Sequence, residues 1–178
     1  MIFPVPDTRN GVIYTSGDIY CAGSVERIIQ SKYSSAIAWG TANLAKYVPF
    51  VVSQPTIVSQ VMIFNGTISG NLDVGVYNGL SLAQLVSSGS TAHAGASAGQ
   101  TITLTATTLP PGFYFLALAF DNATASIRQN SATNTQTVAF GGFREETTAF
   151  PLPATATLQY PTSIYLPFIA LFPTHLGL

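Results

Sequence analysis

The stretch that decides the fold is TIVSQVMIF at residues 56–64, followed by the turn pair Asn65-Gly66. Its β-branched and apolar residues are typical of a strand, and Asn-Gly closes a strand at low cost because both residues tolerate a positive φ. The next segment, LDVGVY at residues 72–77, closes in the same way at Asn78-Gly79. Its even-numbered residues are apolar and share one face. We predict that the two segments form a hairpin with one face in a core.

The same pattern of short strands and turn residues continues to residue 172. Residues 101–105 alternate with period two, and residues 113–120 are apolar on both faces, as expected of a central strand that is covered on both sides. Weaker strand candidates are residues 125–128 and 137–140. The last run, 164–172, contains Pro167, which lacks a ladder donor and indicates a sheet edge or a break. We expect two packed antiparallel sheets of about eight strands.

The two ends of the chain differ from the middle. Residues 1–45 combine proline and glycine with short apolar pieces, which predicts an extended N-terminal arm and connecting segment, with a helical turn near residues 24–30. Residues 46–178 are assigned to the domain proper, with an extended proline-rich tail after Glu146 that we expect to wrap a neighbouring subunit. The predicted fold class is all-β: a two-sheet antiparallel jelly-roll-like sandwich with an extended N-terminal arm.

The composition is unusually poor in charge. Only 7% of the residues are charged and 47% are hydrophobic, with a formal net charge of -1, whereas an ordinary soluble domain is about a quarter charged. The apolar runs are too short to span a bilayer, so we expect no membrane insertion. The six Lys and Arg residues are scattered, which argues against nucleic acid as a partner. A chain of this kind is expected to be covered by neighbours, as a homo-oligomer.

The residues that usually carry catalysis or bind metal are sparse. His93 and His175 lack the spacing of a metal site, and Cys21 is the single cysteine, which excludes an internal disulfide. Glu145 and Glu146 are adjacent, so on a strand they point to opposite faces and make a poor general acid and base pair. We expect no catalytic residue, no cofactor and no metal, and therefore no enzyme.

Three residues are candidates for contact with a partner or a glycan: Trp39, Tyr77 and Asp73. Aromatic rings can stack on sugars, although packing in a core or subunit interface is their more frequent role. Asp73 lies on the strand face opposite Leu72. We expect it on a solvent face or opposite an arginine such as Arg128, with a polar contact to a neighbouring subunit as the functional alternative.

Four pieces of the chain resemble a module of tailed-bacteriophage structural proteins. In that module a hairpin of the form NG…SGN.DVG.Y precedes a strand of the form L.PG.YYLAL. The pieces here keep that order and lie within residues 47–117 of the 178-residue chain. They are residues 47–66, 71–77, 87–92 and 109–117. The resemblance implies a jelly-roll-like β-sandwich and supplies no catalytic residues.

The resemblance and the composition together lead to one expected function. We expect a non-enzymatic virion protein, assembled in the host cytoplasm, that decorates or cements the capsid as a homo-oligomer, with a trimer expected from the class. Its partners would be the major capsid protein or other virion proteins. The alternative is a tail- or fibre-associated adhesion module that binds host surface glycan through exposed aromatics and loops such as residues 87–99.

Overall fold

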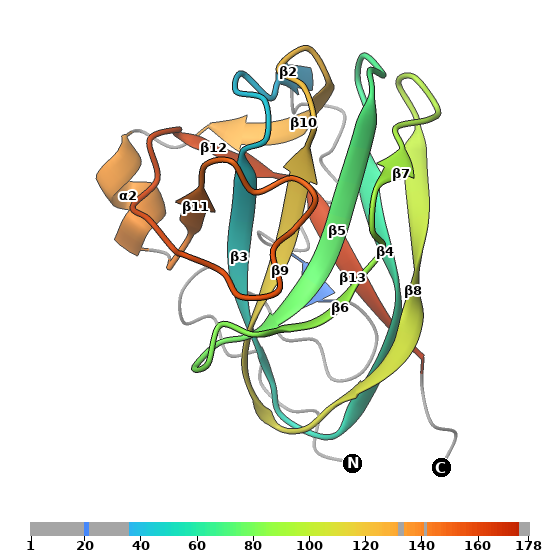
Figure 1. Ribbon diagram of the computed structural model, residues 1–178, viewed down its shortest axis with the longest axis vertical. Helices are drawn as coiled ribbons and strands as arrows, with labels where there is room; N and C mark the ends of the chain where they lie inside the picture. The colour runs from blue at the N-terminus through green and yellow to red at the C-terminus, as the bar shows by residue number, and fades with distance from the viewer. Residues whose placement is uncertain (1–19, 22–35, 132–133, 141, 175–178) are drawn as a thin grey trace, which may run out of the picture.

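The computed structural model describes residues 20–21, 36–131, 134–140 and 142–174, and it is an all-β sandwich (Figure 1). Two large antiparallel sheets pack face to face, and a small third sheet closes one end. The elements are β1 (Tyr20–Cys21), β2 (Ala36–Ala38), β3 (Ala45–Val52), β4 (Thr56–Phe64), β5 (Asn71–Asn78), β6 (Gln84–Ser87), β7 (Thr91–Ala92), β8 (Gly99–Leu109), β9 (Gly112–Phe120), β10 (Ser126–Ser131), α2 (Thr135–Phe140), β11 (Arg144–Glu146), β12 (Tyr165–Pro167) and β13 (Ile169–Thr174).

The two large sheets differ in size and composition. The six-stranded sheet has the order β11-β3-β9-β5-β6, with β7 paired to β5, and the four-stranded sheet has the order β1-β13-β4-β8. The small sheet has the order β12-β10-β2. As predicted from its unbroken apolar run, β9 lies in the middle of its sheet between β3 and β5.

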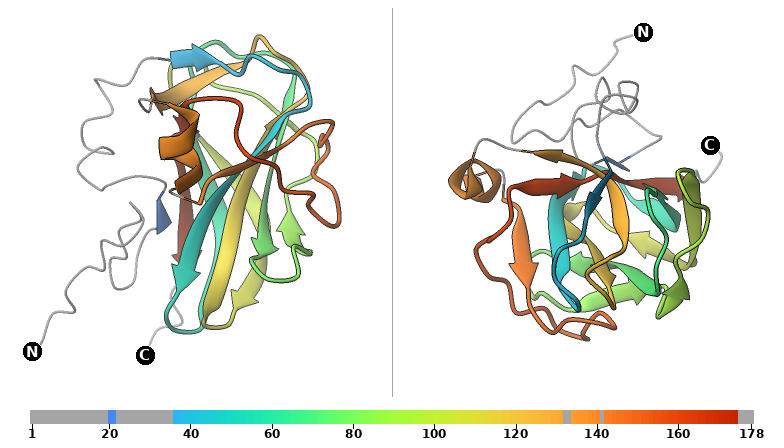
Figure 2. Two further views of the ribbon diagram at one scale, coloured as in Figure 1. Left: turned by 90° about the vertical axis from the view of Figure 1, so that its left-hand side faces the viewer. Right: turned by 90° about the horizontal axis from the view of Figure 1, so that it is seen from above.

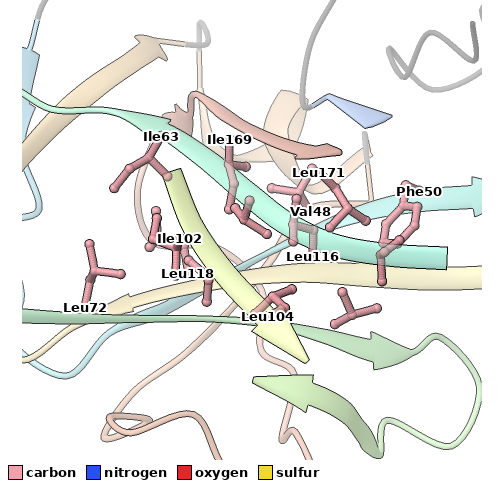
Figure 3. Close-up of a cluster of buried hydrophobic side chains, with 14 of the residues drawn as sticks. Val48, Phe50, Ile63, Leu72, Ile102, Leu104, Leu116, Leu118, Ile169 and Leu171 are labelled. Carbon is pink, nitrogen blue, oxygen red and sulfur yellow. The ribbon is translucent and has the colours of Figure 1, made fainter. Parts of the chain in front are cut away.

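The main core fills the space between the two large sheets (Figure 3). The four-stranded sheet contributes side chains such as Ile63, Ile102 and Leu171, and the six-stranded sheet contributes side chains such as Leu72 and Leu118. Each fully buried side chain of this size contributes about 1.5–3 kcal/mol of hydrophobic stabilisation. The period-two pattern of the strands therefore determines which faces meet.

Two predictions about local structure are wrong. The predicted hairpin does not form: β4 pairs with β8 and β13, whereas β5 pairs with β9, β6 and β7 in the other sheet. The loop at residues 65–70 crosses between the sheets, and it brings β5 to a position where one face meets the main core and the other meets the tail. Residues 137–140 belong to helix α2 and not to a strand. The prediction for Pro167 is confirmed, since β12 ends there and β13 begins at Ile169.

The ends of the chain are more closely integrated than the sequence indicated. Residues 36–44, assigned to the arm, belong to the sandwich, because β2 pairs with β10 and both Trp39 and Leu44 are buried. Within the first 35 residues only β1 is described, and it pairs with β13. The predicted helical turn at residues 24–30 and His175 lie outside the described residues.

The tail after Glu146 covers the chain's own sheet instead of extending away from it. We call residues 147–158 the strap. It crosses the outer face of the six-stranded sheet as the orange-red loop in front of β3 and β9 in Figure 1. Seen from above in Figure 2, the strap and β13 lie on opposite sides of that sheet. A second apolar cluster, which includes Ala117 and Leu152, fills the space beneath the strap.

Candidate functional site

The three residues singled out for partner or glycan contact are interior side chains. Trp39 is 3% exposed, and Asp73 and Tyr77 are 0% exposed. The indole of Trp39 donates to the carbonyl of Leu44 at 2.8 Å and its ring meets that of Phe120 at 4.9 Å. Their burial corrects the expectation that they present a contact surface, because a side chain without exposed area cannot touch a glycan.

Asp73 fastens the strap to the six-stranded sheet. Its Oδ1 accepts hydrogen bonds from the hydroxyls of Ser87 at 2.7 Å and Ser88 at 3.1 Å, and its Oδ2 accepts one from the backbone N–H of Leu152 at 3.0 Å. The prediction of a solvent face or an arginine partner is therefore wrong. Its face opposite Leu72 was predicted correctly, but that face is the one that the strap covers.

Two tyrosines complete this polar layer under the strap. The hydroxyl of Tyr77 donates to the carbonyl of Pro153 at 2.6 Å and accepts from Gln84 at 3.1 Å. The hydroxyl of Tyr47 donates to Oε2 of Glu146 at 2.6 Å. Burial raises the pKa of Tyr77 to about 12, and burial together with the bond to Glu146 raises the pKa of Tyr47. Both hydroxyls therefore stay protonated at neutral pH and act as donors.

A close approach at Gly75 lets the strap pack onto the sheet. A Cβ at Gly75 would lie 2.8 Å from the carbonyl oxygen of Val86 and 3.1 Å from the Leu152 side chain. A larger residue would push these neighbours away, so the glycine is required by space. The sequence shows a glycine inside a strand, but only the structure shows what lies against it.

Lys46 is a buried cation on the other face of the same sheet. Its Nζ donates to Oε1 of Gln129 at 3.0 Å and to the carbonyl of Tyr165 at 3.2 Å, and it lies 4.6 Å from the centroid of the Trp39 ring. Burial lowers the pKa of Lys46 to about 8, while the nearby charge of Glu145 opposes that shift. These contacts join β3 to β10 and β12, so Lys46 ties the small sheet to the large one.

The adjacent carboxylates of β11 serve different partners, as their positions on a strand predict. Glu146 bonds to Tyr47 under the strap. Glu145 accepts from the backbone N–H of Thr162 at 2.7 Å and from the hydroxyls of Thr162 and Ser163. Glu146 therefore ties β11 to Tyr47 of β3, whereas Glu145 fixes residues 162–163 of the tail.

His93 is buried at the end of the sandwich where the loops after β4, β7 and β9 meet. Its Nδ1 accepts from the backbone N–H of Ser69 at 3.3 Å, and its ring lies 4.9 Å from that of Phe120. Burial lowers the pKa of His93, whereas the hydrogen bond from Ser69 and the charge of Asp121 oppose that shift.

No group of three or more His, Cys, Asp or Glu residues that could hold a metal ion occurs in the described part of the chain. None of the helices described is long and apolar enough to span a bilayer.

The four-stranded sheet differs from the six-stranded sheet in its lack of charged residues. Its strands β1, β4, β8 and β13 contain no Asp, Glu, Lys or Arg. On its outer side the threonines 101, 103 and 105 of β8 and Gln60 of β4 are exposed. This uncharged, exposed sheet is the best candidate for a contact surface in the described residues.

Most of the aromatic residues described pack in the interior of the protein. Nine of them are buried among the described residues, and Phe113 and Tyr160 are the exposed ones, Tyr160 with 78% of its area. The guanidinium of Arg144 lies 5.2 Å from the centroid of the Tyr160 ring. The buried set is Trp39, Tyr47, Phe50, Tyr77, Tyr114, Phe115, Phe120, Phe143 and Phe168.

Comparison with known proteins gives no relative. No protein-family model, no curated protein and no solved structure matches this chain. Its function is therefore proposed from its sequence, its surfaces and its contacts.

Proposed function

We propose that this chain is a non-enzymatic structural protein of a tailed-bacteriophage virion that decorates or cements the capsid. The observation that carries the proposal is the four-stranded sheet, whose strands have no charged residue and whose outer side exposes threonine and glutamine. Centres of protein interfaces are depleted of charge because burying a charge without a partner is costly. A neutral sheet loses little when a neighbour covers it.

The mechanism is mechanical. The chain works as a homo-oligomer, a trimer by the class it resembles, whose neutral surfaces bury area against the major capsid protein or other virion proteins. Contacts that bridge adjacent subunits oppose their separation when the shell is under pressure. The work takes place in the virion, after assembly in the host cytoplasm.

The distribution of aromatic residues favours this role over the adhesion alternative. A glycan-binding surface needs several exposed rings that converge, whereas most aromatic residues described here are buried in the two apolar clusters or beside them. The loop at residues 87–99 is also tied down, since Ser87 and Ser88 bond to Asp73 and His93 is buried. A tail-associated adhesion module remains the competing outcome of the test.

The test is to locate and count the chain in purified virions by imaging at a resolution that separates subunits. Hundreds of copies on the shell would support decoration. A few copies at the tail would favour the adhesion module, and glycan-array binding would then be measured. Absence of the chain from the particle would overturn both roles.

A second experiment compares the stability of particles with and without the chain, and so tests the mechanical role. Particles assembled without the chain should lose genome at a lower temperature or internal pressure than complete particles, and adding the purified protein back should restore them. Equal resistance with and without the chain would contradict a cementing role.

A further inference from the structure

At three of the four edges of the two large sheets, other segments of the same chain pair with part of the edge strand. β1 pairs with the edge of β13. At β11, the backbone of Glu145 exchanges two hydrogen bonds with Gln159, at 3.1 and 2.8 Å. At β6, Gln84 donates its backbone N–H to Ala154 at 2.9 Å, and Ala83 bridges to Thr155. Capping of this kind satisfies the backbone groups that an edge strand would otherwise offer to another protein.

The fourth edge, β8, is not capped in the part of the chain that the structure describes. β8 is 11 residues long, pairs with β4 on one side, and forms the right-hand border of the molecule in Figure 1. Its first residues contact the loop before it, because the side chain of Gln100 bonds to Ala92 and Ala94. Residues 101–108 follow with no described strand on their outer side.

The sequence of β8 lacks the usual protection of an exposed edge. Natural edge strands carry lysine, proline or inward-pointing charge, or they are very short. Residues 99–109 read GQTITLTATTL, with none of these. A register shift opposite Ser59 interrupts the strand, but residues 101–103 before it keep a regular antiparallel ladder with β4.

We propose that β8 pairs antiparallel with β8 of a second copy of this chain, which joins two four-stranded sheets into one continuous sheet. This inference rests on the proposed function and deepens it, since it names a second copy as the partner of the uncharged sheet. Backbone donors and acceptors of an antiparallel pair are complementary when a strand meets its own copy across a two-fold axis.

Two observations select a second copy as the occupant. The other three edges of the large sheets are short or partly paired by the chain, so β8 offers the longest open edge among the described residues for pairing between copies. Both strands are neutral, so no charge is buried without a partner when they meet. A two-fold contact produces a dimer, so the trimer expected from the class would have to arise through another surface.

The test uses charge at the edge and a matched charge one strand further in. The edge variant is Thr101→Lys with Thr103→Lys, both on exposed positions, and the control is Gln60→Lys, which is exposed on β4 directly opposite Thr103. Molar mass of the full chain is measured by light scattering at increasing concentration. We expect dimers for the wild type and for Gln60→Lys, and at least a tenfold weaker dimer for the edge variant, with cooperative melts retained by all three.

Hydrogen exchange of the wild type gives a second measurement that does not depend on a variant folding. Amides in residues 101–108 should exchange more slowly as the dimer forms on concentration. A wild type that stays monomeric at high micromolar concentration would overturn the proposal, and protected amides in that monomer would assign the edge to another part of the same chain. A dimer unaffected by the edge lysines, or equally weakened by Gln60→Lys, would also overturn it.

Failure of this inference and failure of the proposed function give different results. Virion imaging reports where the chain is located, whatever its state in solution. Light scattering reports the β8 contact, whatever the particle contains. A shell-bound chain that is monomeric in solution would retain the decoration role and remove the β8 pairing.

Discussion

The two large sheets of this molecule handle their polar groups in opposite ways. The four buried charged residues among those described, Lys46, Asp73, Glu145 and Glu146, all lie on the six-stranded sheet, whose outer face is covered by the strap. The four-stranded sheet has no charged residue in its strands and leaves β8 uncapped in the described structure. The chain therefore covers the outer face of one sheet with its own tail, whereas the other sheet is held by its backbone ladders and by apolar packing on one face and leaves β8 uncovered in the described residues.

The largest difference between the sheets should appear at Asp73. Asp73→Ala removes the acceptor of three hydrogen bonds beneath the strap, and we expect a loss of about 3 kcal/mol in the free energy of unfolding, because the buried N–H of Leu152 is left without a partner and two half-buried serine hydroxyls lose an acceptor. The measurement is the urea midpoint and slope. The control, Thr103→Ala on exposed β8, should cost less than about 1 kcal/mol. Similar losses for the two variants would contradict the contrast between the sheets.

A second contrast between the two sheets is the space around a glycine in each of them. Gly75→Ala should cost about 2 kcal/mol, because the new Cβ would lie 2.8 Å from the carbonyl oxygen of Val86. Gly99→Ala on β8 meets nothing nearer than 3.6 Å, and it should be neutral or stabilise by up to about 0.5 kcal/mol through a less flexible unfolded chain. Thermal unfolding of both variants checks the expectation. A neutral Gly75→Ala would mean that neither β6 nor the strap packs as closely against Gly75 as the structure indicates.

The buried lysine predicts a pH dependence that belongs to the six-stranded sheet. Burial lowers the pKa of Lys46 from its ordinary value of 10.5 to about 8 in the folded protein. Between these values the unfolded chain holds the proton more tightly than the folded one, so stability should rise with pH above about 8. From pH 8 to 9.5 we expect a gain of about 1–2 kcal/mol.

The matched variant for this test is Lys46→Met. The difference in free energy of unfolding between wild type and variant is followed by urea titration at each pH, which cancels groups common to both. The window ends below pH 10, because the raised pKa values of Tyr47 and Tyr77 make stability fall once tyrosines ionise in the unfolded chain. A constant difference across the window would show that burial does not lower the pKa of Lys46.

The smallest effect concerns the fastening of the strap. Tyr77→Phe removes the donor to the Pro153 carbonyl, so we expect a loss of about 1 kcal/mol and faster hydrogen exchange in residues 147–158. Tyr160→Phe, at an exposed ring, should change neither quantity. Unchanged exchange in the Tyr77 variant would show that the other contacts alone hold the strap.

Sequence reasoning succeeded where the signal is local. Alternation placed Leu72 and Asp73 on opposite faces of β5, the apolar run of β9 predicted a central strand, and Pro167 marked a break between strands. Each depends only on the pleat of a strand or on a missing backbone donor. The predicted hairpin between residues 56–64 and 72–77 does not form, because strand pairing depends on which remote strands compete for the same sheet edge.

The residues that fasten the strap and the small sheet could not be found from the sequence, because their partners are remote. Asp73 bonds to a backbone N–H that lies 79 residues away, and Lys46 bonds to a side chain 83 residues away. The sequence pattern around an aspartate in a strand is the same whether its side chain faces water or a covering segment. The sequence around Gly75 likewise gives no sign that Leu152 packs against it.

The sequence by itself determined the class of this protein: an all-β sandwich with few charges, since period-two patterns and composition are local properties of the chain. The tertiary structure alone decided which strands share a sheet, that the tail after Glu146 covers the chain's own β5 and β9, and that β8 is the edge without a cap in the described residues. The physical reason is that burial and edge capping are set by long-range contacts, whose cost in chain entropy is recovered only when the whole sandwich has formed.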